Sequence, residues 1–217
     1  MDIDPSALDL ADRYKILIGS VVPRPIAWVS TLSPHGRPNL APFSFFNGVS
    51  SNPLSILFCP ANKPDGSEKD TLRNLSHPAA QFVVNIVTHA QSHRMASTAE
   101  ELPYGESEWD LASLAPAPSR IVKPARVKEA PIAFECEVSQ IIRLNPGAPS
   151  GGNIVIGRVV SIHAAEGLVN AAHHVDAARL DAIGRMAGIS YCTTRDRFEI
   201  PWGRKALERS PPPPSDR

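Results

Sequence analysis

Short apolar runs separated by turn-forming residues dominate the chain, and this pattern predicts β-strands. The run PIAWVSTL at residues 25–32 is apolar and rich in β-branched residues, and LAPFSFF at 40–46 follows it across the turn-forming sequence SPHGRPN. Two such runs around a turn predict a β-hairpin. By the same pattern, further strands are expected at 54–58, 81–87, 132–144 and 153–164.

Helical patterns are fewer and shorter. Residues 6–17 carry apolar side chains at roughly helical spacing, which predicts a short leading helix or arm, and Asp70 can cap a brief helix over DTLRNLSH. Other helical stretches are expected at 89–99 and 175–186. Because the strands outnumber the helices and do not alternate regularly with them, we expect a mainly β fold with a few helices, arranged as an antiparallel barrel.

The sequence predicts one folded domain with two appendages. Residues 1–20 form the N-terminal arm or short helix, residues 21–202 form the domain, and residues 203–217 form a proline-rich, polar tail that is expected to be disordered. Within the domain, residues 102–123 mix proline, serine and charge, which predicts an excursion over the surface that could serve as a lid or specificity loop.

Composition narrows the classes of function. The 22 Lys and Arg residues balance the 22 Asp and Glu residues, so the chain has no overall field to attract nucleic acid or an anionic membrane. Three widely spaced cysteines without a CxxC pair favour neither a disulfide framework nor a four-cysteine zinc site. The first residues lack a secretion-signal pattern and no apolar stretch approaches roughly 18 residues, so we expect no membrane span and a cytoplasmic location.

Two segments hold the densest groups of side chains that could bind a ligand. The segment NLAPFSFFNGVSSN at 39–52 combines amides, hydroxyls, aromatic rings and a glycine, but a barrel strand with core phenylalanines and a polar turn would have the same composition. Lys69, Asp70 and Thr71 stand at the expected start of a helix, where free N–H groups attract phosphate. An exposed helix cap would also have this sequence.

Several other catalytic motifs are missing from the sequence. His89 and His93 have the i,i+4 spacing of metal ligands but no HExxH motif, so no metal site is expected. The chain has no GxSxG elbow to present a nucleophilic serine. It also has no GxGxxG loop, so a nicotinamide cofactor would be a transient substrate without a Rossmann site.

Three motifs occur in the order found in one known family. The segments PRPIAWVSTLSPHGRPNLAPFSFFNGVSSNP, KDTLRNL and FVVNIV resemble the flavin reductase-like, FMN-binding split-barrel family, which includes flavoredoxin-like proteins and flavoprotein oxygenases. The resemblance covers residues 14–202 and includes the later segments IVIGRVVSIH and RLDAIGRMAGISY. It implies a split barrel that holds FMN, with FAD as the alternative cofactor.

The resemblance assigns several residues to the cofactor. The isoalloxazine ring would lie against a set of residues that act mostly through main-chain groups: Thr31, Asn39, Ser44, Phe45, Phe46 and Asn47. The phosphate, a multiply charged anion that needs charge-assisted hydrogen bonds, would be held by Ser50, Ser51, Lys69 and Thr71.

The resemblance also suggests residues for the open face of the flavin. His163 and Arg185 are the candidate catalytic residues, with Tyr191 nearby, although the sequence Met-Ala-Gly at 186–188 replaces the usual glycine pair of the family. Asn85, within FVVNIV, is expected to face the flavin. Arg24 is a less specific candidate for a phosphate or partner contact.

The expected function follows from the same resemblance. It implies an oxidoreductase that transfers hydride from NAD(P)H, a transient co-substrate, to FMN and passes electrons to a small-molecule acceptor or a partner oxygenase. A homodimer is expected. Two alternatives remain open, namely a non-catalytic flavin carrier and a partner-binding barrel whose flavin site has decayed.

Overall fold

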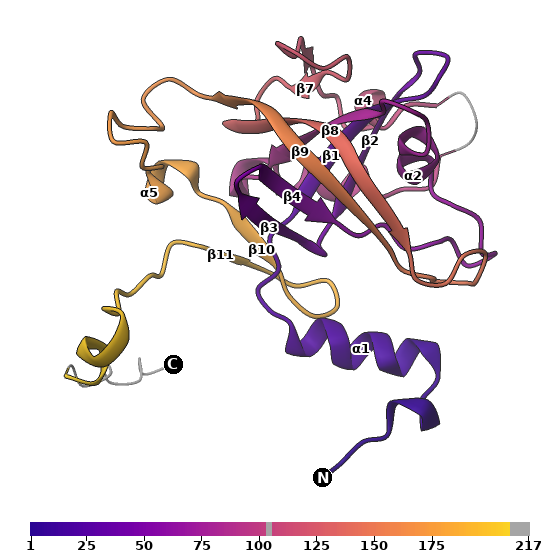
Figure 1. The fold of residues 1–217 in the computed structure, drawn as a ribbon, viewed down its shortest axis with the longest axis horizontal. Helices are drawn as coiled ribbons and strands as arrows, with labels where there is room; N and C mark the ends of the chain where they lie inside the picture. The colour runs from indigo at the N-terminus through magenta and orange to yellow at the C-terminus, as the bar shows by residue number, and fades with distance from the viewer. Residues whose placement is uncertain (103–105, 209–217) are drawn as a thin grey trace.

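A seven-stranded antiparallel sheet forms the body of the protein (Figure 1). The computed structural model describes residues 1–102 and 106–208. The strands lie in the order β2-β1-β5-β8-β9-β4-β3, which confirms the predicted mainly β, antiparallel architecture. Their bounds are β1 Ala27–Leu32, β2 Pro38–Phe43, β3 Phe46–Ser51, β4 Leu54–Phe58, β5 Gln81–Ile86, β8 Ile132–Arg143 and β9 Asn153–Ala164.

Strand β1 shows how the sheet buries both of its faces. Successive side chains of a strand point to opposite faces, so Ala27 and Val29 join one apolar cluster while Trp28 joins the other. The first cluster fills the curved interior of the sheet, where the Phe58 ring contacts the rings of Phe43 and Phe82 at centroid distances of 5.1 and 5.4 Å.

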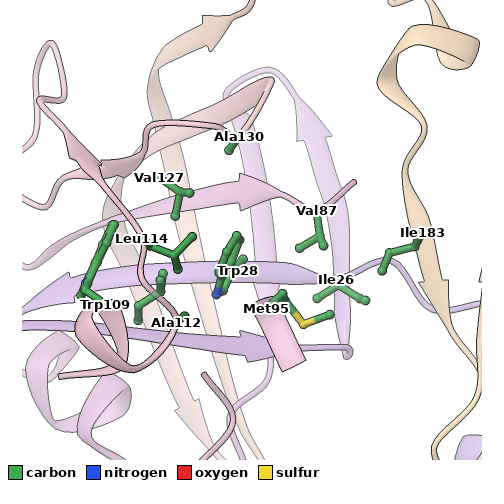
Figure 2. Packing of buried hydrophobic residues seen from close by; sticks show 11 residues of the cluster. Ile26, Trp28, Val87, Met95, Trp109, Ala112, Leu114, Val127, Ala130 and Ile183 are labelled. Atoms are coloured by element: carbon green, nitrogen blue, oxygen red, sulfur yellow. The ribbon is translucent and has the colours of Figure 1, made fainter. Parts of the chain in front are cut away.

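The second cluster covers the outer face around Trp28. Figure 2 shows Trp28 surrounded by side chains from the segments that cross this face, among them Met95, Leu114 and Val127. The indole N–H of Trp28 donates to Thr98 Oγ1 at 2.9 Å. The outer face of β1 is therefore part of the core, which explains why the residues IAWV at 26–29 are apolar without interruption.

The helices are short and lie at the margins of the sheet. Helix α1 (Leu10–Ser20) begins at Asp9, whose side chain accepts from the Asp12 N–H, and it lies apart from the sheet with only Ile18 buried (Figure 1). Helix α2 (Asp70–Leu75) buries Leu72 and Leu75 in the interior cluster. The remaining helical elements are η1 Pro5–Ala7, η2 His89–Gln91, α3 Ser92–Ser97, α4 Glu108–Leu111, α5 Ala177–Leu180 and η3 Gly203–Leu207.

The structure differs from the prediction in two segments. No strand was predicted over NGVSS at 47–51, but these residues belong to β3, an edge strand that pairs with β4. The helix expected at 175–186 ends at Leu180, because Asp181 adopts a left-handed backbone with φ of 46°. The chain then forms β10 (Ile183–Arg185), which pairs with β11 (Tyr191–Thr193).

The excursion at 102–123 is tied to the sheet over its second half. It contains α4 and β6 (Pro116–Ala117), which pairs with β7 (Arg126–Val127). The buried carboxylate of Glu135 on β8 accepts from the N–H groups of Arg120 and Ile121 at 2.7 Å and of Val122 at 3.1 Å. These three hydrogen bonds hold residues 120–122 against the sheet.

The described part of the chain has no helix of the length and apolar character needed to cross a membrane. In the predicted tail, residues 203–207 form η3, while residues 209–217 lie outside the described residues, so the expected disorder of the tail stays a prediction.

Candidate functional site

A continuous cleft runs along β2, the strand at one edge of the sheet. Its largest cavity, of about 630 Å³, lies in the size range of small-molecule sites. A smaller cavity of about 80 Å³ shares Asn39, Lys63, Asp70, Leu102 and Glu108 with it and adds Lys69 and Thr71. A third, of about 470 Å³, shares Arg37, Pro38 and Glu106 with the largest and adds Thr31. We call these three cavities the β2 cleft.

Hydrogen bonds between side chains fix the floor of the β2 cleft. Asn39 on β2 donates through Nδ2 to Thr71 Oγ1 on α2 at 2.9 Å, and Asn74 on α2 donates to Thr31 Oγ1 on β1 at 3.0 Å. Thr31 and Asn39 are paired residues of neighbouring strands, so both point to the same face of the sheet. Each threonine accepts one hydrogen bond, which leaves its hydroxyl proton for a ligand oxygen.

The structure thus brings together four of the residues that the sequence assigned to the cofactor, namely Thr31, Asn39, Lys69 and Thr71. Lys69 precedes α2 with an extended backbone, and its side chain caps no helix N–H. Thr31 and Thr71 are each only 1% exposed, and Lys69 supplies a cation to the cavity that Thr71 lines. A phosphate needs this combination of positive charge and fixed hydroxyl donors.

Acidic side chains balance the cations of this region. The charged groups lining the two cavities that contain Asn39 are Asp70, Glu100, Glu101, Glu106 and Glu108 on the acidic side and Arg37, Lys63, Lys69 and Arg73 on the basic side. Burial raises the pKa of Glu108, and the nearby carboxylate of Asp70 raises it further. The β2 cleft is therefore not a simple basic patch, and its acids oppose an anionic ligand.

The corner between β2 and β3 carries the residues predicted to line the flavin ring. Ser44 Oγ accepts from Arg24 Nε at 3.3 Å, and the Arg24 guanidinium lies over the Phe45 ring at 5.8 Å. Phe46 packs against the interior cluster, whereas the exposed Asn47 accepts from the Gly48 N–H at 2.9 Å. These contacts order the corner.

Ser50 and Ser51 lie farther along β3 and line none of the three cavities of the β2 cleft. Ser50 Oγ accepts from the Asn52 N–H at 3.1 Å, which is a local turn contact. The assignment of these two serines to the phosphate stays a prediction, because nothing in the described chain joins them to Lys69 and Thr71.

Arg24 has a structural role instead of the phosphate contact considered for it. Its side chain is 3% exposed and donates to the carbonyls of Ile18, Val21 and Met186 at 2.6, 2.8 and 2.9 Å. Burial lowers the pKa of Arg24, and the neighbouring Arg185 adds to this effect. One guanidinium therefore joins the end of α1 to the β10–β11 hairpin and, through Ser44, to the β2–β3 corner.

Asn85 is also corrected, from a flavin contact to a core residue. It is fully buried, its Nδ2 donates to the Trp28 carbonyl at 3.0 Å, and its Oδ1 accepts from the Val127 N–H at 2.8 Å. Both ends of the amide are thus used inside the protein. Both partners are backbone groups, so the amide serves the core.

The two candidate catalytic residues lie outside the β2 cleft. His163 is on β9 opposite Ala133, and burial together with the nearby Arg126 lowers its pKa. Arg185 donates to the Tyr191 hydroxyl and stacks on the Tyr191 ring at 4.5 Å. Their catalytic roles remain predictions.

Sequence reasoning missed Glu108 and Asn74. Glu108 follows Ser107, the N-cap of α4, whose side chain accepts from the Trp109 N–H. The Glu108 carboxylate accepts from the N–H of Leu40 on β2. The sequence places Glu108 in a mixed surface segment, and only the fold brings it to the site.

In the described residues, Trp109 Nε1 is the single buried side-chain N or O atom without a hydrogen-bond partner. No group of three or more His, Cys, Asp or Glu in that part of the chain is placed to hold a metal ion.

Comparison with known proteins identifies the family to which this architecture corresponds. The chain matches the flavin reductase-like domain over residues 18–179. It is similar to component B of nitrilotriacetate monooxygenase from Bacillus cereus, with 37% identity, a TM-score of 0.86 and coverage of 92% of this chain and 98% of that chain.

Two further solved structures are similar to the chain. The 2-nitrobenzoate 2-nitroreductase NbaA of Pseudomonas fluorescens is 31% identical with a TM-score of 0.81, over 94% of this chain and 97% of that one. Flavoredoxin of Desulfovibrio vulgaris (Miyazaki F) shares the fold at 18% identity, with a TM-score of 0.71 over 92% of this chain and 96% of that one.

Proposed function

Because the chain belongs to the flavin reductase-like family of split-barrel oxidoreductases, we propose that it binds FMN in the β2 cleft and transfers hydride from NADH or NADPH through it. We propose FMN instead of FAD because FMN carries one phosphate, and Lys69 and Thr71 form a single candidate phosphate site. The observation that carries the proposal is the convergence of these two residues with Asn39 at the edge of the sheet.

The residues present fit a phosphorylated flavin. When bound, flavin supplies the capacity to accept a hydride and release electrons. Lys69 would donate charge-assisted hydrogen bonds to the phosphate, and Thr71, oriented by Asn39, would donate its remaining hydroxyl proton. Thr31, held by Asn74, offers a second fixed hydroxyl, and the ordered corner at Ser44 and Phe45 gives the ring a wall. Fixed donors of this kind need no reorganisation during the reaction.

The first experiment measures flavin content and flavin reduction. Purified protein should absorb in the visible region, release FMN on denaturation, and bleach when NADH or NADPH is added without oxygen. Lys69→Met should weaken FMN binding about 10- to 100-fold, since a charge-assisted hydrogen bond contributes about 1.5–3 kcal/mol. Lys128→Met, at an exposed lysine outside the β2 cleft, is the matched control.

Three outcomes separate the alternatives. Bound FMN that neither nicotinamide reduces would favour the non-catalytic flavin carrier. Failure to bind FMN supplied in excess would refute the proposal and favour a barrel with a decayed flavin site. Equal loss of affinity in both lysine variants would remove Lys69 from the phosphate site.

The relatives suggest where the electrons go. One is a monooxygenase component and another a nitroreductase, so the proposed acceptors are a partner oxygenase or a small aromatic molecule. The three cysteines are free, which suits a reducing cytoplasm. Stopped-flow mixing of reduced protein with 2-nitrobenzoate would test direct transfer, because a partner-dependent protein would leave that compound unchanged.

A homodimer is proposed from the exposed apolar residues of the two arms. Tyr14 and Leu17 on α1 are 56% and 48% exposed, and Phe198 and Trp202 near the C-terminus are 73% and 94% exposed. Apolar groups gathered on arms outside the body of a protein mark an interaction surface. Light scattering should give twice the 23.4 kDa of the chain, and a monomer would contradict the proposal.

A further inference from the structure

The outer edge of β2 exposes a single hydrogen-bond donor. In an antiparallel pair, the main-chain N–H and C=O of alternate residues point away from the partner strand. Leu40 has this outward orientation, because its N–H donates to a side chain and not to β1. Residues 38 and 42 share its orientation, and both are prolines without an N–H. Leu40 therefore supplies the one outward donor of β2, next to its own outward carbonyl.

The carboxylate of Glu108 accepts the hydrogen bond of this donor. Its Oε2 accepts from the Leu40 N–H at 3.3 Å, across 68 residues of sequence. Ser107 is the N-cap of α4, so Glu108 is the first residue of the helix and lies at the edge of β2. Glu108 lines the same two cavities as Asn39, so its carboxylate stands inside the site that would hold the flavin.

We propose that Glu108 determines flavin affinity by competition: its carboxylate holds the Leu40 N–H until a carbonyl oxygen of the flavin ring replaces it. This inference rests on the proposed FMN site. The pyrimidine end of the flavin ring carries carbonyl oxygens beside an N–H group. That pattern complements the outward N–H and C=O of Leu40, whereas a carboxylate can satisfy only the N–H. Lys69 and Thr71 hold the phosphate in this arrangement, and Leu40 holds the ring.

The competition makes the affinity of the free protein lower than its site would otherwise allow. The ligand must displace a hydrogen-bonded carboxylate before the ring can reach β2, and the displaced Glu108 remains close to Asp70. Removal of the side chain should therefore tighten binding. A purely structural role predicts the opposite, because loss of the contact would loosen α4 and weaken any ligand that depends on it.

Titration of apoprotein with FMN and with riboflavin tests the inference. Glu108→Ala should bind both flavins about 10-fold more tightly than the wild type, from the release of one hydrogen bond to a charged acceptor. Glu108→Gln keeps an acceptor for Leu40 without the charge, so it should gain about 3-fold or less. Glu129→Ala, at an exposed acid outside the β2 cleft, controls for net charge. Urea unfolding of each variant checks that it is folded.

Riboflavin separates the ring from the phosphate. An equal gain for both flavins supports competition at the ring, whereas a gain with FMN alone would show charge repulsion of the phosphate and overturn the inference. Unchanged or weaker binding by folded Glu108→Ala would also overturn it, while leaving the proposed function intact if Lys69→Met weakens FMN binding. A protein in which neither wild type nor Glu108→Ala binds FMN would refute both.

Discussion

Replacement of Asn85 by leucine tests whether this residue belongs to the core or to the flavin site. Leucine has a similar size but no polar atoms, so Asn85→Leu leaves the Trp28 carbonyl and the Val127 N–H without their present partner. An unsatisfied buried polar group costs about 1–3 kcal/mol. The Val127 N–H loses its acceptor outright, while the Trp28 carbonyl, which pairs with Asn85 across β1 and β5, loses one hydrogen bond. Together these losses should lower the free energy of unfolding by about 2–4 kcal/mol.

The assay has two parts because the two roles predict different results. Thermal unfolding should show a fall in Tm of about 5–15 °C, the shift that this free energy produces in a chain of this size. FMN titration at low temperature, where the variant is folded, should give an affinity within about 2-fold of the wild type, a ratio worth less than half a kcal/mol. Asn145→Leu, at an exposed asparagine in the β8–β9 turn, is the control. A variant as stable as the wild type that binds FMN tenfold more weakly would refute the reasoning.

Two further predictions concern buried or partly buried ionisable groups. In Glu135→Gln, one carboxylate oxygen becomes an NH2 group that faces backbone N–H donors instead of accepting from them. Urea unfolding should therefore show a free energy of unfolding lower by about 2–4 kcal/mol. A decrease below about 0.5 kcal/mol would mean that residues 120–122 do not depend on Glu135. The pKa of His163 is lower in the folded protein than its ordinary value of 6.5, because of burial and Arg126. The unfolded chain therefore binds the proton more readily, and the contribution of His163 to stability falls as the pH drops through 6.5. His163→Asn should flatten this part of the stability curve, and an unchanged slope between pH 7 and pH 5, roughly the range in which histidine titrates, would contradict the assignment.

The strands that the sequence predicted best are those with a clear apolar pattern. β4 and β9 begin and end at the residues expected, because LSILF and NIVIGRVVSIH carry their pattern over the whole strand. β3 was missed because an edge strand can remain exposed. After Phe46 at its start, the only large apolar residue of β3 is Val49, which is 48% exposed, so no apolar periodicity marks the strand.

The late helix failed for a different reason. Residues 175–186 contain alanine, leucine and arginine, which favour helix by local propensity. The structure instead pairs Ile183 with Thr193 and joins Arg24 to Arg185 through two backbone hydrogen bonds. Tertiary pairing overrides local propensity here, and a single sequence does not reveal a partner more than 150 residues away.

In the candidate site, too, local motifs could be predicted from the sequence and tertiary contacts could not. A short motif predicted Lys69 and Thr71 and the family resemblance predicted Asn39, and the structure places the three in one cavity while their binding role stays a prediction. Glu108 was not found, because its relation to the site depends on a contact with Leu40. Asn85 was found but misassigned, since sequence alternation tells which residues face inward and not which polar group they meet.

The prolines of β2 also affect whether a second copy of the chain can add a strand to the edge of the sheet. Prolines at an edge weaken pairing with a second copy because they offer no N–H, and the one outward N–H of this edge, that of Leu40, already bonds Glu108. The opposite edge, β3, is interrupted by a register shift between Gly48 and Ser50. Both open edges of the sheet therefore disfavour aggregation by strand addition.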